Sequence, residues 1–184
     1  EYGKLYFCHG VHGIGKSSLA NSIVGLSTPI KGEILYGDVN FYKDGRDKRY
    51  EIRQEMGVIF DKPGLLSNLT VYENLKLRFL ALKKENGFNG YRDEKFDEII
   101  MNELKKLDLE NKKDLRPFLL SQGEIKKVSI SRALLSKPKI IIWDDAFDGL
   151  SDEDKVFYEA KILNLLEANS LIILLNSWVS FKDK

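Results

Sequence analysis

The sequence predicts an α/β fold in which a mostly parallel sheet forms the core and a group of helices forms a subdomain. The apolar run at residues 5–8 precedes a glycine-rich turn and a helical pattern, as at the start of a parallel α/β unit. A second apolar run, residues 139–143, ends in two aspartates. Between these two strands, apolar residues recur at helical spacing from about residue 70 to residue 135.

Residues 10–17 fit the phosphate-loop pattern G-x-x-x-x-G-K-[ST]. The glycines let backbone N–H groups turn inward around a di- or triphosphate. Lys16 supplies a charge to the β and γ oxygens, Ser17 offers a hydroxyl to Mg²⁺, and the helix expected over residues 17–26 directs its positive end at the anion. His12 is expected to border the phosphates rather than act as a base, because the loop works through backbone amides. The residues expected to bind nucleotide here are Gly10, His12, Gly13, Ile14, Gly15, Lys16, Ser17 and Ser18.

Two shorter strands follow this helix. Residues 31–38 predict a short strand between glycine turns, which is typical of a hairpin. Residues 56–60 predict a buried strand that ends in a turn at residues 61–64. The first strand is also expected to be buried, so its Cys8 is interpreted as a small core residue. Because Cys8 is the only cysteine, the chain has no internal disulfide and no cysteine-cluster metal site.

Three helices are predicted in the middle of the chain. Apolar residues on one face define the first two, which are separated by a polar segment at residues 83–90: Val71, Leu75, Phe79 and Leu82 in the first, and Phe96, Ile99, Ile100, Leu104 and Leu107 in the second. The third, at residues 125–135, follows Ser121 and Glu124, whose spacing is that of a capping box. A helix N-terminus with a serine hydroxyl is also an anion site, so Ser121 is open to two interpretations, a helix cap or an anion ligand.

The apolar run at residues 139–143 predicts a buried strand that carries Asp144 and Asp145 at its C-terminal end. An open parallel sheet binds its ligands at that edge. Asp144 is therefore expected to hold Mg²⁺ through water and Asp145 to face the attacking water; the alternative is a pair of solvated acids. A helix that starts after Ser151 and a strand at residues 171–175 complete the core.

Length and charge limit the classes of protein that the chain can belong to. Its 184 residues suit one domain, with an expected core of residues 1–65 and 136–184 and a helical subdomain of residues 66–135. With 29 Lys and Arg against 28 Asp and Glu, the formal net charge of +1 does not indicate a nucleic-acid-binding surface. The apolar runs are far shorter than the about 20 residues of a membrane span, so we expect any membrane role to be peripheral. Because no methionine and no secretory pattern precedes the first strand, we expect a fragment of a longer protein.

The order of these motifs resembles the nucleotide-binding domain of an ATP-binding cassette (ABC) transporter. The segments that carry the resemblance are the phosphate loop, LTVYENL at residues 69–75, LSQG at residues 120–123 and the strand that ends at Asp144. They cover essentially the whole chain, and they imply a P-loop NTPase fold of the ABC ATPase type. Within the family, the PG pair at residues 63–64 and the compact length are most similar to the haem-exporter ATPase of cytochrome c maturation.

The resemblance implies a composite site for ATP and Mg²⁺. ATP bound by the phosphate loop of one domain would be covered by Ser121 and Gly123 of a second domain, either a copy or a paralogue. The resemblance also implies a separate transmembrane subunit and a peripheral location on the cytoplasmic or mitochondrial matrix face of a membrane. No nucleic-acid partner is expected. The family's N-terminal strands and its adenine-stacking aromatic residue would precede Glu1, so they are expected to be missing here.

Several functional positions of the family are substituted in this chain. Asp145 stands where the family has a catalytic glutamate, and the loss of one methylene would move the base by about 1 Å and cost on the order of 10²-fold in rate. The switch histidine matches Ser177, and the Q-loop glutamine matches Asp61 or Lys62. The catalytic candidates are therefore Asp145 and Ser177, and the metal candidates are Ser17, Asp144 and Asp61.

These substitutions leave two functions open. The first is the ATP-binding subunit of an ABC-type membrane transporter, related to haem export and with weakened hydrolysis. The second is a catalytically degenerate, ABC-like scaffold subunit that keeps nucleotide as a structural ligand inside a larger membrane complex. The intact Lys16, Ser17 and Asp144 favour nucleotide binding in both cases. A nucleic-acid ATPase ranks third, for want of a basic face.

Overall fold

The computed structural model describes residues 1–11, 13–85, 93–145, 147–168 and 170–176. Contacts between these residues divide the chain into two compact units. The first comprises Glu1–Asp61, Pro138–Asp148 and Ala160–Lys184, and the second comprises Lys62–Lys137 and Gly149–Glu159. Each unit is described separately below.

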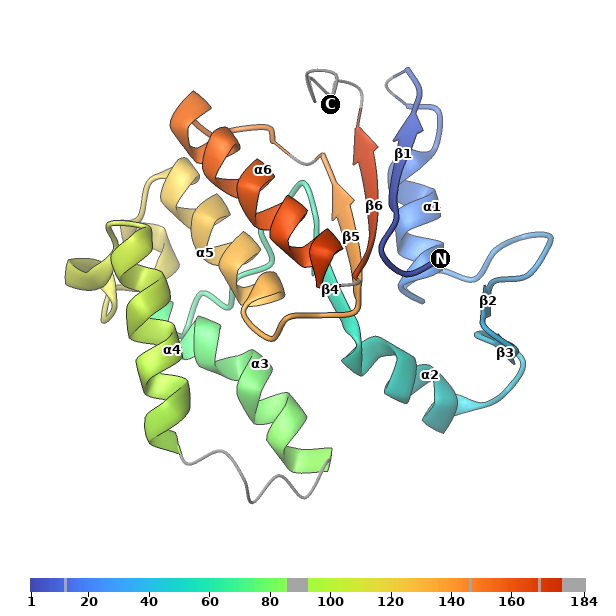
Figure 1. The fold of residues 1–184 in the computed structure, drawn as a ribbon, viewed down its shortest axis with the longest axis horizontal. Coiled ribbons are helices and arrows are strands. Elements are labelled where there is room, and N and C mark those ends of the chain that lie inside the picture. Colours follow the sequence, from blue (N-terminus) through green and yellow to red (C-terminus); the bar gives the residue numbers. More distant parts are fainter. Residues whose placement is uncertain (12, 86–92, 146, 169, 177–184) are drawn as a thin grey trace. The chain divides into compact units, whose positions relative to one another are not determined.

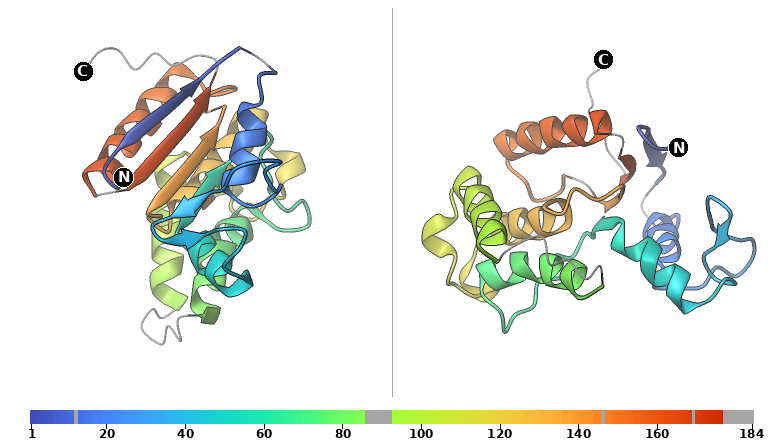
Figure 2. Two further views of the ribbon diagram at one scale, coloured as in Figure 1. Left: turned by 90° about the vertical axis from the view of Figure 1, so that its right-hand side faces the viewer. Right: turned by 60° about the horizontal axis from the view of Figure 1, so that its bottom comes forward.

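The first unit is built on a four-stranded sheet with the strand order β1-β6-β5-β4 (Figure 1). The strands are β1 (Leu5–His9), β4 (Met56–Ile59), β5 (Ile140–Asp144) and β6 (Leu171–Asn176). Neighbouring strands run parallel, so their C-terminal ends share one edge of the sheet. The left view of Figure 2 shows these strands side by side in one twisted sheet. The predicted α/β fold class with a parallel core is confirmed.

The core of the first unit lies around β5, in which every residue is buried. A strand with neighbours on both sides and both faces covered reads as a continuous apolar run, and residues 140–143 have that sequence. The helix α1 (Lys16–Ile23) packs on this sheet through Ala20, which is fully buried. Ala20 belongs to a core cluster that also contains Met56, Ile142 and Leu175.

The expectation that the first strand is buried was wrong. Among the described strands only β6 pairs with β1, and Tyr6 and Phe7 remain 45% and 40% exposed. An apolar run shows that a strand forms, but the number of its neighbours depends on residues distant in the chain. Cys8 is half-buried and packs against the core cluster, in agreement with its interpretation as a core residue.

A hairpin and a helix precede β4. The strands β2 (Leu35–Tyr36) and β3 (Val39–Asn40) form the expected antiparallel hairpin. The helix α2 (Arg46–Gln54) was not predicted, because none of its residues is buried and it lacks the apolar stripe by which a helix is recognised. Arg53 of α2 donates hydrogen bonds to the carbonyls of Val24 and Gly25 at 3.0 and 2.6 Å. These bonds satisfy backbone acceptors at the C-terminal end of α1.

The second unit contains α3 (Val71–Glu85), α4 (Asp93–Lys106) and α5 (Gln122–Leu134). Two short 3-10 helices, η1 (Glu110–Lys112) and η2 (Pro117–Leu119), lie between α4 and α5 in the chain. The helix α3 packs against both α4 and α5 (Figure 1). The predicted apolar faces of α3 and α4 are buried through Val71, Leu75, Phe79, Phe96, Ile100, Leu104 and Leu107. The apolar spacing therefore identified the side of each helix that packs.

The helix α6 (Asp152–Glu167) begins in the second unit and ends in the first. Ser151 starts it, as predicted, because its hydroxyl oxygen accepts a hydrogen bond from the Asp154 N–H at 3.2 Å. Lys127 of α5 pairs with Asp154 at 2.7 Å, and the Tyr158 hydroxyl donates to the Lys127 carbonyl at 3.3 Å. These contacts group Gly149–Glu159 with the helices, whereas the expected core included this segment. Within the described part of the chain, no helix has the length and apolarity needed to cross a bilayer.

Candidate functional site

The phosphate loop connects β1 to α1, and its backbone requires glycine. Gly13 and Gly15 adopt left-handed conformations with φ of 81° and 105°, which L side chains rarely take. A Cβ on Gly10 would lie 2.7 Å from Cγ2 of Ile14. Loop residue His12, a predicted nucleotide ligand, lies outside the described residues.

The first turn of α1 is available for an anion. The helix begins at Lys16 with Gly15 as its N-cap, without a side-chain cap and without an acidic residue in the first turn. Helices leave their first N–H groups without intrahelical acceptors, and these groups bind phosphate oxygens when no side chain caps them. The end of α1 therefore fits the predicted phosphate site.

Lys16 is folded over the loop. Its ammonium group donates to the carbonyls of Gly10 and Val11 at 2.8 and 3.1 Å. A phosphate oxygen carries negative charge and is a stronger acceptor than a neutral carbonyl. The lysine thus stands where a bound polyphosphate would offer it a better partner.

A pocket of about 290 Å³ lies beside the phosphate loop, entirely within the first unit. Its lining brings together residues that follow β1 and β4 with residues at the C-terminal ends of β5 and β6: Gly13, Gly15, Lys16, Ser17, Ser18, Asp61, Asp144, Asp145 and Leu175. One lysine, a helix N-terminus, two hydroxyls and three carboxylates line this space. This combination of groups fits a polyphosphate together with a divalent cation.

The two predicted acids at the end of β5 differ in their surroundings. Asp144 is the last residue of the strand and only 5% exposed, so its carboxylate is held in place by the sheet. Asp145 has a left-handed backbone with φ of 53°, and its N–H donates to the Leu175 carbonyl at 2.9 Å. Aspartate is among the few L residues that enter this region readily.

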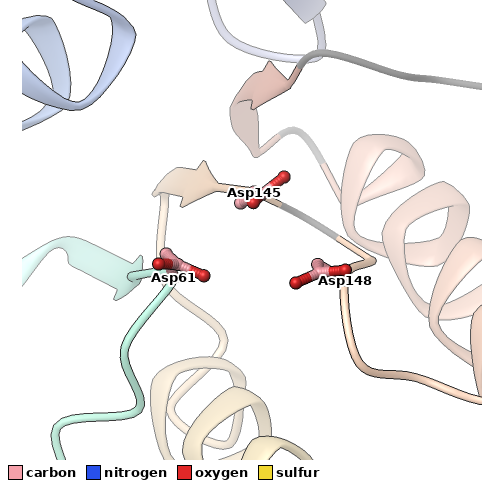
Figure 3. Close-up of side chains that lie close together, drawn as sticks. All are labelled: Asp61, Asp145 and Asp148. Carbon is pink, nitrogen blue, oxygen red and sulfur yellow. The ribbon is translucent and has the colours of Figure 1, made fainter. Parts of the chain in front are cut away.

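A fourth acid, Asp148, lies close to two of the carboxylates that line the pocket. Carboxylate oxygens of Asp61, Asp145 and Asp148 all lie within 4.8 Å of one another (Figure 3). The metal prediction grouped Asp61 with Ser17 and Asp144, and Asp148 was not considered. A signal for it exists in the sequence, where four acids stand at positions 144, 145, 148 and 152, but the turn that brings Asp148 toward Asp61 is a tertiary feature. Three carboxylates at this separation offer oxygen ligands to a divalent cation.

The predicted capping box at the start of α5 is present. The Ser121 hydroxyl oxygen accepts from the Glu124 N–H at 3.3 Å, and a Glu124 carboxylate oxygen accepts from the Ser121 N–H at 2.9 Å. The cap uses Ser121 as an acceptor, and a hydroxyl can accept and donate at the same time. The two interpretations of Ser121, helix cap and anion ligand, are therefore compatible.

The charge of Glu124 is balanced within the second unit. Lys112 donates from its ammonium group to the other carboxylate oxygen of Glu124 at 2.6 Å. This hydrogen bond, with the one from the Ser121 N–H, lowers the pKa of Glu124 below its ordinary value. Nearby, the Cα of Gly123 faces the Gly149 carbonyl, which would lie 3.7 Å from an added Cβ.

The structure thus gathers most of the predicted nucleotide and metal residues in one pocket. Lys16, Ser17, Asp61, Asp144 and Asp145 all line it. Ser121 and Gly123 lie at the start of α5 in the second unit. The predicted catalytic residue Ser177 lies outside the described residues.

Comparison with known proteins identifies relatives of this chain. The family model described as ABC transporter matches residues 1–148. The methionine import ATP-binding protein MetN of Lactobacillus delbrueckii subsp. bulgaricus is 34% identical over 172 residues, which are 91% of this chain and 46% of that protein. MetN of Protochlamydia amoebophila is 37% identical over 149 residues, which are 80% of this chain and 41% of that protein. The chain thus spans less than half the length of these relatives.

A solved structure has the same fold. It is a dimeric ATP-binding cassette in a post-hydrolysis state, bound to ADP and Pi, and it matches this chain with a TM-score of 0.81 at 26% sequence identity. The match covers 96% of this chain and 75% of the solved one.

Proposed function

The chain belongs to the ABC transporter family of ATP-binding domains, and we propose that it binds MgATP beside the phosphate loop as the ATP-binding subunit of a membrane transporter. The observation that carries the proposal is the convergence of Lys16, Ser17 and Asp144 on one pocket. In a nucleoside triphosphate with bound Mg²⁺, the phosphate oxygens are a partner for Lys16, and the cation is a partner for Ser17 and Asp144.

In this proposal, each group has a separate role. The backbone amides of the loop and of α1 hold the phosphates, and the Lys16 ammonium group turns from the loop carbonyls to the β and γ oxygens. Ser17 and Asp144 would hold Mg²⁺, which neutralises charge on the phosphates when bound. Asp145 accepts a proton from the attacking water.

We infer that hydrolysis is slow. The side chain of Asp145 is short, and its carboxylate lies in the group formed with Asp61 and Asp148 rather than alone in the pocket. A general base needs a defined position within hydrogen-bond reach of the water. A carboxylate that lies among other carboxylates is less well placed to accept a proton from one defined water molecule.

The partners and the cargo follow from the resemblance to the family. A second nucleotide-binding domain, a copy or a paralogue, would cover the nucleotide with its Ser121 and Gly123, and a separate transmembrane subunit would carry the cargo. The location would be peripheral, on the cytoplasmic or matrix face of a membrane. The sequence resemblance favours haem export, while the MetN relatives are named for methionine import. Transport assays with reconstituted subunits and both cargoes would decide between them.

The alternative is a scaffold subunit that binds nucleotide without turning it over. The hydrogen bond from the Ser151 hydroxyl to Asp154 at 2.8 Å favours it, because the resemblance to the family implies an aspartate at the position of Ser151, and this serine is engaged within its own chain. The two functions share nucleotide binding and differ in phosphate release.

Calorimetry with MgATP tests the shared step. Lys16→Ala should weaken binding at least about tenfold, because it removes the cation that contacts the phosphates. Lys31→Ala is the matched control, since Lys31 is exposed and does not line the pocket. Equal affinity of wild type and Lys16→Ala would show that the pocket is not the nucleotide site.

A further inference from the structure

The carboxylate of Glu124 lies between a lysine and a backbone amide. One oxygen accepts from the Lys112 ammonium group at 2.6 Å, and the other accepts from the Ser121 N–H at 2.9 Å. The side chain of Lys112 is 39% exposed and that of Glu124 is 21% exposed, so the pair is partly shielded from water. A charge-assisted bond of this kind restricts the rotamer of Glu124 and, through it, the backbone of Ser121.

The backbone that carries Lys112 is itself anchored. The N–H groups of Val71 and Tyr72 donate to the carbonyls of Leu115 and Lys113 at 2.8 and 2.9 Å. These are N–H groups of the first turn of α3, which have no acceptor within their own helix. The loop that follows Lys112 therefore serves as the cap of α3.

The start of α3 is fixed to the turn before it by Asn74, which is fully buried. The Asn74 side-chain oxygen accepts from the Leu66 N–H at 2.8 Å, and its amide nitrogen donates to the carbonyls of Leu66 and Thr70 at 3.0 and 2.9 Å. Hydrogen bonds thus join the turn at residues 66–70 to the first turn of α3. The backbone hydrogen bonds from α3 to residues 113–115 extend this network to the segment next to Lys112.

We propose that Lys112 is a positioning residue for Ser121, acting through Glu124 and linking the start of α3 to the start of α5. The proposal rests on the proposed function, in which Ser121 contacts the nucleotide held by a second domain. Lys112 does two things there. It orients the carboxylate that holds the Ser121 N–H, and it balances a negative charge that would otherwise repel the incoming phosphates.

Neighbouring lysines supply a matched test. Lys113 is adjacent in the chain, but its ammonium group pairs with the exposed Asp114 at 2.7 Å. Lys112→Met should increase the amide exchange rate of Ser121 about tenfold and weaken MgATP-driven dimerisation about tenfold. Lys113→Met should change neither. Lys112→Arg, which keeps the charge, should remain within about twofold of wild type.

A double variant separates the charge-balancing role of Lys112 from its positioning role and from a general loss of stability. In Lys112→Met with Glu124→Gln, the uncompensated negative charge of Glu124 is absent. The dimerisation affinity should therefore recover about threefold or more relative to Lys112→Met alone. A general loss of stability would not be rescued by this second change. Dimerisation would be followed by sedimentation velocity of the full chain, and exchange by NMR or mass spectrometry.

The outcomes of the two measurements are distinguishable. If Lys112→Met matches Lys113→Met in both exchange and dimerisation, the positioning role is overturned. If the double variant is no better than Lys112→Met, the charge-balancing role is overturned. If wild type does not bind MgATP, the proposed function fails; if it binds MgATP without dimerising, its partner domain is a paralogue. The Ser121 exchange rates, which need no nucleotide, then decide whether Lys112 positions Ser121.

Discussion

Asp145, the proposed general base, has an unusual backbone conformation. Its φ of 53° places it in the left-handed region, directly after the buried end of β5. Such conformations persist where the surrounding structure determines them, and here the N–H is held by the Leu175 carbonyl. The backbone therefore directs this carboxylate toward Asp61 and Asp148 (Figure 3).

Lengthening the base should raise turnover at the expense of stability. We expect Asp145→Glu to increase phosphate release, because the extra methylene restores about 1 Å of reach. The same change should cost about 1 kcal/mol of unfolding free energy, since glutamate enters the left-handed region less readily than aspartate. Phosphate release and urea unfolding measure the two effects. An unchanged rate would show that the reach of the base is not the main defect.

Single substitutions of aspartate by asparagine should identify the metal ligands. If Asp144 holds Mg²⁺, then Asp144→Asn abolishes the Mg²⁺ dependence of nucleotide binding, while Asp148→Asn leaves it nearly unchanged. Titration of Mg²⁺ against a fluorescent nucleotide provides the readout. A larger effect of Asp145→Asn or Asp148→Asn would instead assign the metal to the group that contains Asp61.

The helices of the second unit are joined by caps and charges at their ends. Ser121 caps α5, Ser151 caps α6, and residues 113–115 cap α3. A cap contributes about 1 kcal/mol, so these contacts stabilise the helices as well as set the position of Ser121. Their stabilising effect depends on pH where a carboxylate takes part.

The α5 capping box should make stability depend on acid. Glu124 has a pKa below its ordinary value of 4.5, chiefly through the hydrogen bond from Lys112. A lowered folded-state pKa stabilises the protein above the unfolded value, and this contribution is lost as the pH falls through the folded pKa. Between about pH 6 and pH 3, wild type should therefore lose about 1 kcal/mol more stability than Glu124→Gln.

Urea unfolding at several pH values measures this difference. Asp152→Asn is the control, because Asp152 also pairs with a lysine but its side chain is 98% exposed. It should alter the acid dependence less than Glu124→Gln does. Parallel curves for wild type and Glu124→Gln would contradict a charged capping box.

The molecule as a whole keeps its two predicted contact surfaces for nucleotide in different units. The pocket belongs to the first unit, and Ser121 with Gly123 belongs to the second. In the proposed function, a complete site needs a second domain, a copy or a paralogue, and the solved relative in a post-hydrolysis state is a dimer.

Hydrolysis should then depend on protein concentration. We expect phosphate release to stay below about 1 s⁻¹ with saturating MgATP, at the lower limit of ordinary phosphoryl-transfer enzymes. The activity per chain should rise with concentration until the dimer forms. Phosphate release over a hundredfold range of protein tests this. Activity per chain that does not change with concentration would show that one copy suffices.

The sequence by itself determined the local chemistry and the family. The phosphate loop, the strand before Asp144 and the capping box at Ser121 depend on neighbours within a few residues, so their patterns predict them directly. Apolar residues at helical spacing likewise identified the faces of α3 and α4 that are buried. The unpredicted helix α2 marks the limit, because an exposed helix leaves no apolar pattern.

Only the tertiary structure decided which distant residues meet. The strand order β1-β6-β5-β4 leaves β1 at an edge, and the turn after β5 brings Asp148 to Asp61. The link from Lys112 through Glu124 to Ser121 likewise joins segments that are separate in the chain. The physical reason is that pairing and side-chain contact depend on how the whole chain packs, while the energies that form a turn or a cap are contained in a few consecutive residues.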